Sequence, residues 1–340
     1  MTAPPAQQSH DDVSHAELIA AFERGERFAL LGHEDPDLDS IGSQLALAGV
    51  LRARGKRVRL WSPSPVSEHE AFLPGAGEIS TEYPAGTSID VAVALDTAGV
   101  GRFGQAPPFR PADFPVLVNI DHHKGNERFG TLNWVDPRAS SVGEMLFELF
   151  TEWGVELSAD AVTCLYTSIL SDTGGFAFAN TSARTLQVAG ALVERGADPF
   201  EIWRNTFGAF PQGRHKLLGL ALGTLRLHDN DRIATMRVSQ QMLDEAGAVM
   251  QDTGRFIQYP RSVVGVEAAA ILREQPGGRS VRVGLRSNTP RLDVSRIAAD
   301  LGGGGHPSAS ACTVEGSLDQ VEHTVVAALA DALKEVEQSA

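Results

Sequence analysis

The sequence of 340 residues has only two cysteines, Cys164 and Cys312, and no apolar run of the roughly 20 residues that a membrane span needs. Neither cysteine lies in a C-x-x-C pair, which argues against a redox motif or a zinc knuckle. The opening stretch MTAPPAQQSHDDVSH lacks the basic and apolar regions of a signal peptide. We therefore expect a cytoplasmic protein with reduced thiols and no membrane partner, whose residues 1–15 form a disordered tail.

Basic residues are also scarce, because 29 lysines and arginines face 43 aspartates and glutamates, for a net charge of -14. Proteins that track a long nucleic-acid duplex normally present a basic face that displaces counterions from many phosphates. We expect no long duplex partner here. Any phosphate chemistry must be local, carried by metal ions or by a few Arg, Gly and His residues.

Strands and helices alternate in the first half of the chain. Short apolar runs predict strands over 27–33, 57–61, 88–96 and 114–121, and apolar residues at helical spacing predict helices over 40–54, 140–154 and 158–172, the last capped by Ser158. This alternation predicts an α/β fold with a mostly parallel sheet flanked by helices.

The second half has a different pattern. Residues 183–223 look helical, with breakers at Pro199 and at 211–213, and the stretches DRIATMRVS, SVVGVEAAAILRE and SVRVGLRS read as strands before a closing amphipathic helix. We predict a smaller α+β domain here. The expected boundaries are a first domain over 16–195, a helical linker over 196–213 and a second domain over 214–340.

Three of the predicted strands end in side chains that can bind a metal. They end at His33, at Asp96, and at Asp121 followed by His122. In an open parallel sheet, ligands bind outside the carboxyl ends of the strands, so one crevice could hold all of these side chains. Buried charges there must be paired or ligated to offset their desolvation.

Further acids belong to the same set. Asp37 and Asp39 lie two apart in EDPDLDS, and Asp172 precedes a pair of glycines in SDTGGF. Any one of these residues alone is more often a helix cap or a hydrogen-bonded structural residue. Together, carboxylates and imidazoles favour Mn²⁺, with Mg²⁺, Co²⁺ and Fe²⁺ as alternatives, and the lack of thiolates argues against structural zinc. Two cations need a bridging carboxylate, and Asp96, alone at its strand end, is the candidate.

The segments that carry these residues resemble a known superfamily. GHEDPDLDSIGS, ALDTA, IDHHKGN and SDTGGF are similar to the four successive motifs of DHH phosphoesterases, and LGGGGHPSASA (301–311) resembles the signature of their associated C-terminal domain. Motifs and length together resemble the family of bifunctional oligoribonucleases (nanoRNases) and 3′-phosphoadenosine 5′-phosphate (pAp) phosphatases. The resemblance implies hydrolysis of short RNA and of pAp.

The resemblance also implies roles for single residues. His33, Asp37 and Asp96 would hold one cation, and Asp39, Asp96, His122 and Asp172 the second. His123 would face the substrate phosphate, and Asp121 would orient the histidine pair. The implied catalytic residues are thus Asp96, Asp121 and His123.

In the second domain the resemblance implies residues that grip the substrate: Arg261, Arg286, Ser287, Gly303, Gly304, Gly305 and His306. Glycines let backbone N–H groups approach a terminal phosphate closely, and an arginine can contact it with two hydrogen bonds. Gly302 by itself matches a helix C-cap, because VSRIAADL before it looks helical.

One departure leaves the substrate class open. Leu38 stands between the two aspartates where nanoRNases commonly have glycine, and DLDS is closer to the form seen in related polyphosphatases. The alternatives are a pyrophosphatase or polyphosphatase, a phosphodiesterase for linear or cyclic dinucleotides, and a nucleotide-sensing module without turnover. A RecJ-type exonuclease would have a longer, more basic chain. A homodimer is left open.

Overall fold

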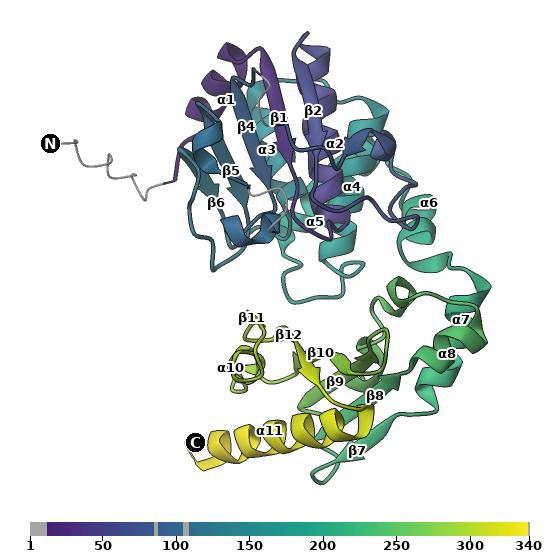
Figure 1. Cartoon of the computed structure of the whole chain (residues 1–340). Coiled ribbons are helices and arrows are strands. Elements are labelled where there is room, and N and C mark those ends of the chain that lie inside the picture. The colour runs from purple at the N-terminus through teal and green to yellow at the C-terminus, as the bar shows by residue number, and fades with distance from the viewer. Residues whose placement is uncertain (1–11, 85–87, 105–108, 339–340) are drawn as a thin grey trace, which may run out of the picture. The chain divides into compact units, whose positions relative to one another are not determined.

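The computed structural model describes residues 12–84, 88–104 and 109–338 of the chain (Figure 1). The chain divides into two compact units, Met1–Ala209 and Phe210–Ala340. The division falls inside the range predicted for the linker, while the predicted domain boundaries themselves stay predictions.

Residues 12–15 do not belong to a disordered tail, contrary to the prediction for residues 1–15. Residues 1–11 lie outside the described residues, but the carboxylate of Asp12 forms an ion pair of 2.6 Å with Arg128. Ser14 caps helix α1 (His15–Arg24), because its hydroxyl oxygen accepts a hydrogen bond from the backbone N–H of Glu17. The prediction is thus wrong for the end of the tail, where a cap and an ion pair fix the backbone.

The first unit contains a six-stranded, fully parallel sheet in the order β3-β2-β1-β4-β5-β6. Four of the strands confirm the sequence prediction, whereas the short β3 and β6 were not predicted. The chain runs outward in opposite directions from β1 and β4, which makes the space between them a topological switch point. The strands are β1 Arg27–Leu31, β2 Arg57–Trp61, β3 Ile79–Ser80, β4 Val91–Leu95, β5 Leu117–Asp121 and β6 Leu132–Val135.

The three predicted helices of this unit are confirmed, and Ser158 caps the third of them as expected. Helix α4 packs against both α2 and α3. The helices that follow α1 are α2 Leu38–Ala53, α3 Val142–Trp153, α4 Ala159–Asp172, α5 Ala183–Glu194 and α6 Pro199–Trp203, with a π-helical turn over Arg204–Gly208 and 3₁₀ turns over Ala76–Glu78, Val100–Phe103 and Pro111–Asp113.

Both faces of the parallel sheet are buried. Along β1, Phe28 and Leu30 point into the core beneath the helices, whereas Ala29 and Leu31 pack into a second cluster that includes Phe103. Because the strand interiors are apolar on both sides, charged side chains can leave the core only where the strands end.

The second unit is an α+β domain around a mixed sheet in the order β11-β12-β10-β9-β8-β7, in which only β8 and β9 pair in parallel. The three strands predicted for this half are confirmed as β8, β9 and β10. The strands are β7 Arg226–His228, β8 Ile233–Val238, β9 Ala268–Glu274, β10 Ser280–Ser287, β11 Gly304–His306 and β12 Ala309–Glu315.

Helices cover this mixed sheet on both faces. On one face, Ala270 and Leu272 of β9 pack into a core with helices α10 and α11, and on the other, Ala269 and Ile271 pack with α7, α8 and α9. The closing helix α11 was predicted. The helices are α7 Gln212–Leu222, α8 Gln240–Ala246, α9 Gln258–Arg261, α10 Val294–Asp300 and α11 Leu318–Gln338, with a 3₁₀ turn over Met250–Thr253.

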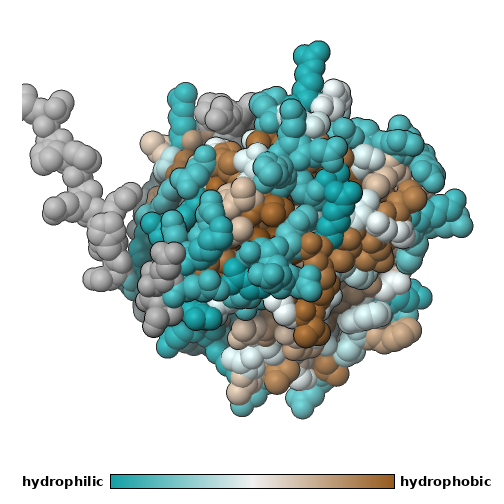
Figure 2. Space-filling view, turned by 90° about the horizontal axis from the view of Figure 1, so that it is seen from below, coloured by the Kyte–Doolittle hydropathy of each residue, from teal (hydrophilic) through white to brown (hydrophobic). Residues whose placement is uncertain are grey.

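The surface is mainly hydrophilic in the view of Figure 2, with smaller apolar areas between the polar residues. Single apolar side chains such as Val264, which is 95% exposed, are common on protein surfaces and need no special account. Within the described residues, no helix is both long and apolar enough to cross a bilayer.

Candidate metal centre and phosphate-binding residues

The carboxyl ends of three adjacent strands bring the predicted ligands of the first unit together. His33 lies two residues beyond β1, Asp96 directly follows β4, and His122 directly follows Asp121 at the end of β5. Since β4 pairs with both β1 and β5, these side chains meet at one edge of the sheet. They flank the switch point between β1 and β4, where open α/β sheets bind their ligands.

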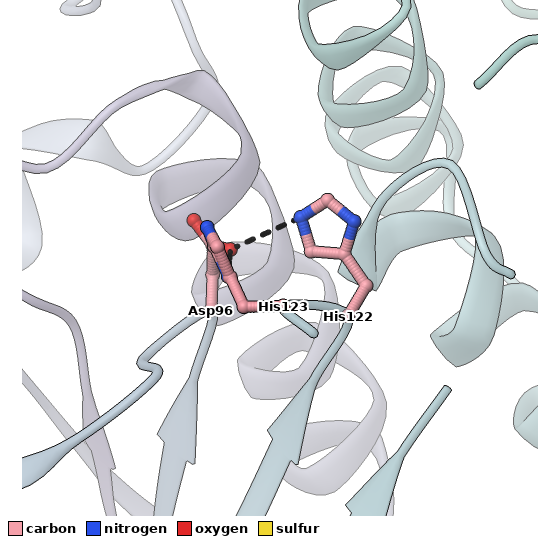
Figure 3. Close-up of side chains that lie close together, drawn as sticks. All are labelled: Asp96, His122 and His123. Carbon is pink, nitrogen blue, oxygen red and sulfur yellow. Dashed lines mark ion pairs between the residues drawn. The ribbon is translucent and has the colours of Figure 1, made fainter. Parts of the chain in front are cut away.

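Asp96 lies at the centre of this group. Its Oδ2 is 3.5 Å from His33 Nε2, and its Oδ1 is 3.5 Å from both His122 Nε2 and His123 Nδ1. Figure 3 shows the two histidines converging on Asp96 from the end of the neighbouring strand. Asp96 is 3% exposed, and its buried Oδ1 has no hydrogen-bond partner among the described residues. A buried carboxylate oxygen without a donor is well suited to a cation.

Among the described residues, three overlapping groups of side chains could hold metal ions, each with ligand atoms within 4.8 Å of one another. The first group is the ligand set predicted for one cation. The second group contains the residues predicted for the other cation except Asp96, which instead lies 3.5 Å from His122. The third contains His123, which the sequence analysis placed toward substrate. The groups are His33, Asp37 and Asp96; Asp39, His122 and Asp172; and Asp96, His122 and His123.

The backbone at Asp96 is held in an uncommon conformation. Its φ of +56° lies in the left-handed region, which aspartate and asparagine adopt more readily than most residues. The backbone N–H of Asp96 donates to Ile120 O at 3.1 Å, so the neighbouring strand β5 fixes the turn. Strained backbone of this kind is concentrated at functional sites.

Asp39 is fully buried in the first turn of α2 and is held by donors from two other helices. Its carboxylate accepts the backbone N–H groups of Val142 and Gly143, at 2.9 and 3.2 Å, at the start of α3. The hydroxyls of Ser43 and Ser168 donate to its Oδ1 at 3.2 and 2.5 Å. These donors fix the carboxylate in a single orientation, with Oδ2 3.7 Å from His122 Nε2.

His33 and His122 each have a backbone carbonyl oxygen beside Nδ1, and at His33 the guanidinium Nη2 of Arg102 also lies 3.0 Å from Nδ1. Nδ1 of His33 lies 2.8 Å from Glu34 O, and Nδ1 of His122 lies 3.3 Å from Ala139 O. An Nδ1–H that donates to a carbonyl leaves Nε2 as the free electron pair, which is the usual state of a metal-bound imidazole.

Asp121 orients only one histidine, whereas we expected it to orient the pair. Its Oδ1 lies 2.8 Å from His123 Nδ1, and its Oδ2 accepts a hydrogen bond of 2.6 Å from Asn126. His122 is instead oriented by the backbone of Ala139. The reason is direction, because consecutive residues at the end of a strand point their side chains to opposite sides.

The carboxylates of the candidate metal centre lie close enough together that a positive charge would stabilise them. Burial and the nearby carboxylates of Asp96 and Asp172 raise the pKa of Asp39 well above its usual range. Although burial opposes its protonation, Asp172 and Asp96 raise the pKa of His122 well above its usual range. Carboxylates this close together repel one another, and divalent cations would remove that repulsion. The residues present therefore fit a site for divalent cations.

Sequence reasoning missed the residues that hold the ligands in place. Ser168 is fully buried in α4 beside the equally buried Thr167, so nothing in the sequence singled out its hydroxyl. Glu144, also fully buried, accepts from the Ser140 hydroxyl at 2.6 Å and pairs with Arg184 at 3.0 Å. Both contacts brace the start of α3, which supplies two donors to Asp39.

In the second unit, the predicted arginines are held by the backbone and by one asparagine. Arg286 on β10 donates from Nη1 to Leu285 O at 2.8 Å. Arg261 donates from Nε to Asn288 Oδ1 at 2.7 Å, and Asn288 Nδ2 donates back to Arg261 O. The buried Ser287 hydroxyl donates to Thr289 O at 2.7 Å. Asn288 is a further residue that positions Arg261.

The predicted glycine loop includes strand β11, which pairs with β12 in an antiparallel hairpin. A Cβ at Gly303 would lie 2.2 Å from Ala311 O, and a Cβ at Gly305, whose φ is +142°, would lie 2.6 Å from the Cα of Ser310. Gly302, with φ of +77°, ends α10 as expected for a helix cap. Close approach of the chain thus accounts for Gly303 and Gly305, and the helix end accounts for Gly302. Gly304 and His306 are exposed residues of β11.

Leu38, the residue that departs from the usual glycine, is buried with 6% exposure in the core beneath the helices. It is the first residue of α2, directly after the cap formed by Asp37. Its side chain therefore points into the apolar core.

Comparisons with known proteins agree with this arrangement. The DHH family, N-terminal domain, matches residues 27–169, and the DHHA1 domain matches residues 230–339. The bifunctional oligoribonuclease and PAP phosphatase NrnA of Thermus thermophilus is 35% identical over 308 residues, which cover 88% of each chain. The protein of the same name from Bacillus subtilis is 28% identical over 88% of this chain and 92% of its own.

The fold is also found in a solved structure. The crystal structure of an exopolyphosphatase-related protein from Bacteroides fragilis superposes with a TM-score of 0.89 over 95% of this chain and 97% of that chain, at 24% identity. From its two matched domains and its relatives, this chain belongs to the DHH phosphoesterase family.

Proposed function

We propose that this protein hydrolyses short oligoribonucleotides to mononucleotides and removes a phosphate from pAp. The observation that carries the proposal is the convergence of His33, His122 and His123 on one buried carboxylate, Asp96, in a chain 35% identical to an NrnA protein. Phosphoryl transfer needs little more from a protein than exact positioning and positive charge at the phosphate.

The proposed ligand sets are those of the sequence analysis: His33, Asp37 and Asp96 for one cation, and Asp39, Asp96, His122 and Asp172 for the other. Mn²⁺ is our first choice, with Mg²⁺, Co²⁺ or Fe²⁺ as alternatives, because the donors are carboxylates and imidazoles. When bound, such cations lower the pKa of a water molecule and offset the negative charge that develops on the phosphate.

The chain itself would supply the remaining groups. Although burial opposes its protonation, Asp121 and Asp96 raise the pKa of His123 above its usual value. A protonated His123 can donate from Nε2 to a phosphate oxygen, while the hydrogen bond from Nδ1 to Asp121 fixes the plane of the ring. Asp121 thus acts by positioning His123.

The second unit would hold the rest of the substrate. Arg261 and Arg286 are the proposed contacts for a terminal phosphate, together with Ser287, His306 and the backbone of Gly303, Gly304 and Gly305. Asn288 supports this assignment because it fixes the guanidinium of Arg261 with a hydrogen bond of 2.7 Å. A planar guanidinium held in place can contact a phosphate with two hydrogen bonds.

The cellular setting is part of the proposal. Both cysteines are buried and unpaired, which agrees with a cytoplasmic enzyme. Short RNA and pAp are the proposed partners, long duplexes are not, and a homodimer stays a prediction.

A time course on labelled RNA from two to more than twenty nucleotides, with and without Mn²⁺, tests the function. Parallel reactions contain pAp, pyrophosphate and a cyclic dinucleotide. We expect metal-dependent release of mononucleotides from the shortest RNA and of phosphate from pAp. Turnover of pyrophosphate alone would favour the polyphosphatase alternative, turnover of the cyclic dinucleotide alone the phosphodiesterase, and metal-dependent binding without turnover a sensing module.

A further inference from the structure

Three arginines lie in a row on one face of the sheet in the second unit. Arg282 and Arg286 are four residues apart on β10, so their side chains project from the same face. Arg273 of β9 is directly opposite Arg282 in the antiparallel register. Directly opposed like charges destabilise a strand pair unless something offsets them.

The guanidinium of Arg273 lies between the other two arginines. A Cβ built on Gly284 would be 3.0 Å from Nη2 of Arg273, so this side chain extends over the backbone of Gly284, which separates Arg282 from Arg286 along β10. Gly284 has no positive φ, and so the glycine provides space for the guanidinium and not an unusual backbone conformation.

None of these three arginines forms an ion pair with an acid among the described residues. Nε of Arg273 is buried without a hydrogen-bond partner among the described residues. Burial, and after it the charges of Arg282 and Arg286, lower the pKa of Arg273 to about 10. By contrast, Arg237 on β8 pairs with both Asp319 and Glu322.

Arginines without an acidic partner are notable in a chain with a net charge of -14. Arg261 adds to it, because its charge, after burial, lowers the pKa of Arg286. A partly buried guanidinium group beside like charges is costly unless an anion offsets the charge. The row of arginines therefore favours binding of a ligand that carries several negative charges.

We propose that Arg273 and Arg282 form a second phosphate site, next to the proposed contact of Arg286 with a terminal phosphate. The ligand is the next backbone phosphate of a single-stranded oligoribonucleotide, so this inference rests on the proposed function. Four residues of strand span about 13 Å, which gives an elongated row suited to successive phosphates of a chain. Each guanidinium presents a fork of donors that matches phosphate oxygens.

Binding of 5′-phosphorylated RNA of one, two and three nucleotides to the full-length protein tests the second site, with the metal removed by chelation so that nothing is cleaved. We expect Arg273→Gln and Arg282→Gln each to weaken trinucleotide binding about tenfold or more and to leave the mononucleotide unchanged. The slope of log affinity against log salt should fall by about 0.7, the value for one lost phosphate contact on a single strand.

Two further variants separate this site from a general effect of charge. Arg291→Gln removes the same charge from an exposed position of the same unit and should bind like the wild type. Gly284→Ala keeps every charge but places a methyl group 3.0 Å from Arg273 Nη2, so it should weaken trinucleotide binding by displacing the guanidinium. Thermal unfolding of each variant reports whether the fold is retained, and the exposed Arg282 is the variant least able to disturb it.

The inference is overturned if the Arg273 and Arg282 variants bind the trinucleotide as tightly as Arg291→Gln does. Its failure can be told from failure of the proposed function. Wild-type cleavage of short RNA with unchanged binding by the variants would sink the second site alone. Length-dependent loss of binding in a protein that hydrolyses no RNA would keep the site and reject the function.

Discussion

Ser168 and Asp39 are joined by a hydrogen bond of 2.5 Å, in which the hydroxyl on α4 donates to the carboxylate on α2. The two residues are 129 positions apart in the chain. Asp39 Oδ2 remains 3.7 Å from His122 Nε2, so the serine fixes one oxygen while the other faces the proposed metal ligands. Residues that orient metal ligands usually tune affinity almost as strongly as the ligands themselves.

Replacing Ser168 by alanine should therefore lower affinity for Mn²⁺ by about 10- to 100-fold. The fold should be retained, because two backbone N–H groups and Ser43 still hold Asp39. Calorimetric titration with Mn²⁺ measures the change. Thr163→Ala is the matched control, since its hydroxyl on the same helix bonds only to Ala159 O in the described structure. Equal affinities in the two variants would show that Ser168 has only a packing role.

The shared carboxylate gives a sharper test of the two-cation proposal. Asp96→Asn should reduce turnover of short RNA at least about a thousandfold and reduce the metal content, because both proposed sites lose a charged ligand. Asparagine tolerates the φ of +56° found at Asp96, so the backbone should be unchanged.

Turnover and bound metal per chain are the two quantities to measure for Asp96→Asn. Asp35→Asn is a suitable control, since Asp35 also has a positive φ, +51°, and belongs to none of the candidate ligand groups. Near-normal activity of Asp96→Asn at saturating Mn²⁺ would reject the shared ligand.

The edge of the sheet that carries the site could be predicted from sequence. His33, Asp96 and Asp121 each follow an apolar run, and parallel strands necessarily bring their carboxyl ends to one edge. Ser158 predicted the start of α4 in the same local way, because it precedes a segment with apolar residues at helical spacing. These features depend only on neighbours along the chain.

Features that depend on distant residues could not be predicted. The strand order, which places β4 between β1 and β5, has no local signature, and neither have the donors that α3 and α4 supply to Asp39. Strand β11, from Gly304 to His306, could not be predicted because a run of glycines indicates a loop. Its extended backbone depends on pairing with β12. Arg273 looked like any polar strand residue until the register placed it opposite Arg282.

An ion pair at the far end of the same strands predicts a pH dependence of stability. Asp90, just before β4, accepts hydrogen bonds from the side chain of Arg27 and from the backbone N–H groups of Glu26 and Arg27, at the start of β1. The Arg27 guanidinium is the main reason that the pKa of Asp90 falls from 3.8 to about 2. A carboxyl with a lowered pKa in the folded state stabilises the fold above its unfolded pKa.

Asp90→Asn should therefore lower the free energy of unfolding at pH 7, by a small amount because the Asp90 side chain is 32% exposed. The difference from wild type should shrink as the pH falls from about 4 to about 2, where Asp90 becomes protonated in both states. Urea unfolding across this range measures it. Glu156→Gln, at an exposed position of the same unit, controls for loss of charge alone. A difference that stays constant down to pH 2 would mean that the Arg27 pair does not lower this pKa.

The charge balance predicts which RNA lengths the protein prefers. With a net charge of -14, nucleotides beyond the binding residues meet an acidic surface within about one Debye length, near 10 Å at 0.1 M salt. Only a few phosphate contacts then contribute: one at the proposed cations, one at Arg286 and one at the row that includes Arg273. Two or three contacts on a single strand predict a slope of log affinity against log salt of about -1.4 to -2.1.

We therefore expect kcat/KM to be highest for RNA of roughly two to five nucleotides and to fall for longer chains. Measuring kcat/KM against both length and salt checks this, and a rate that rises steadily to 20-mers with a steep salt slope would instead identify a processive exonuclease.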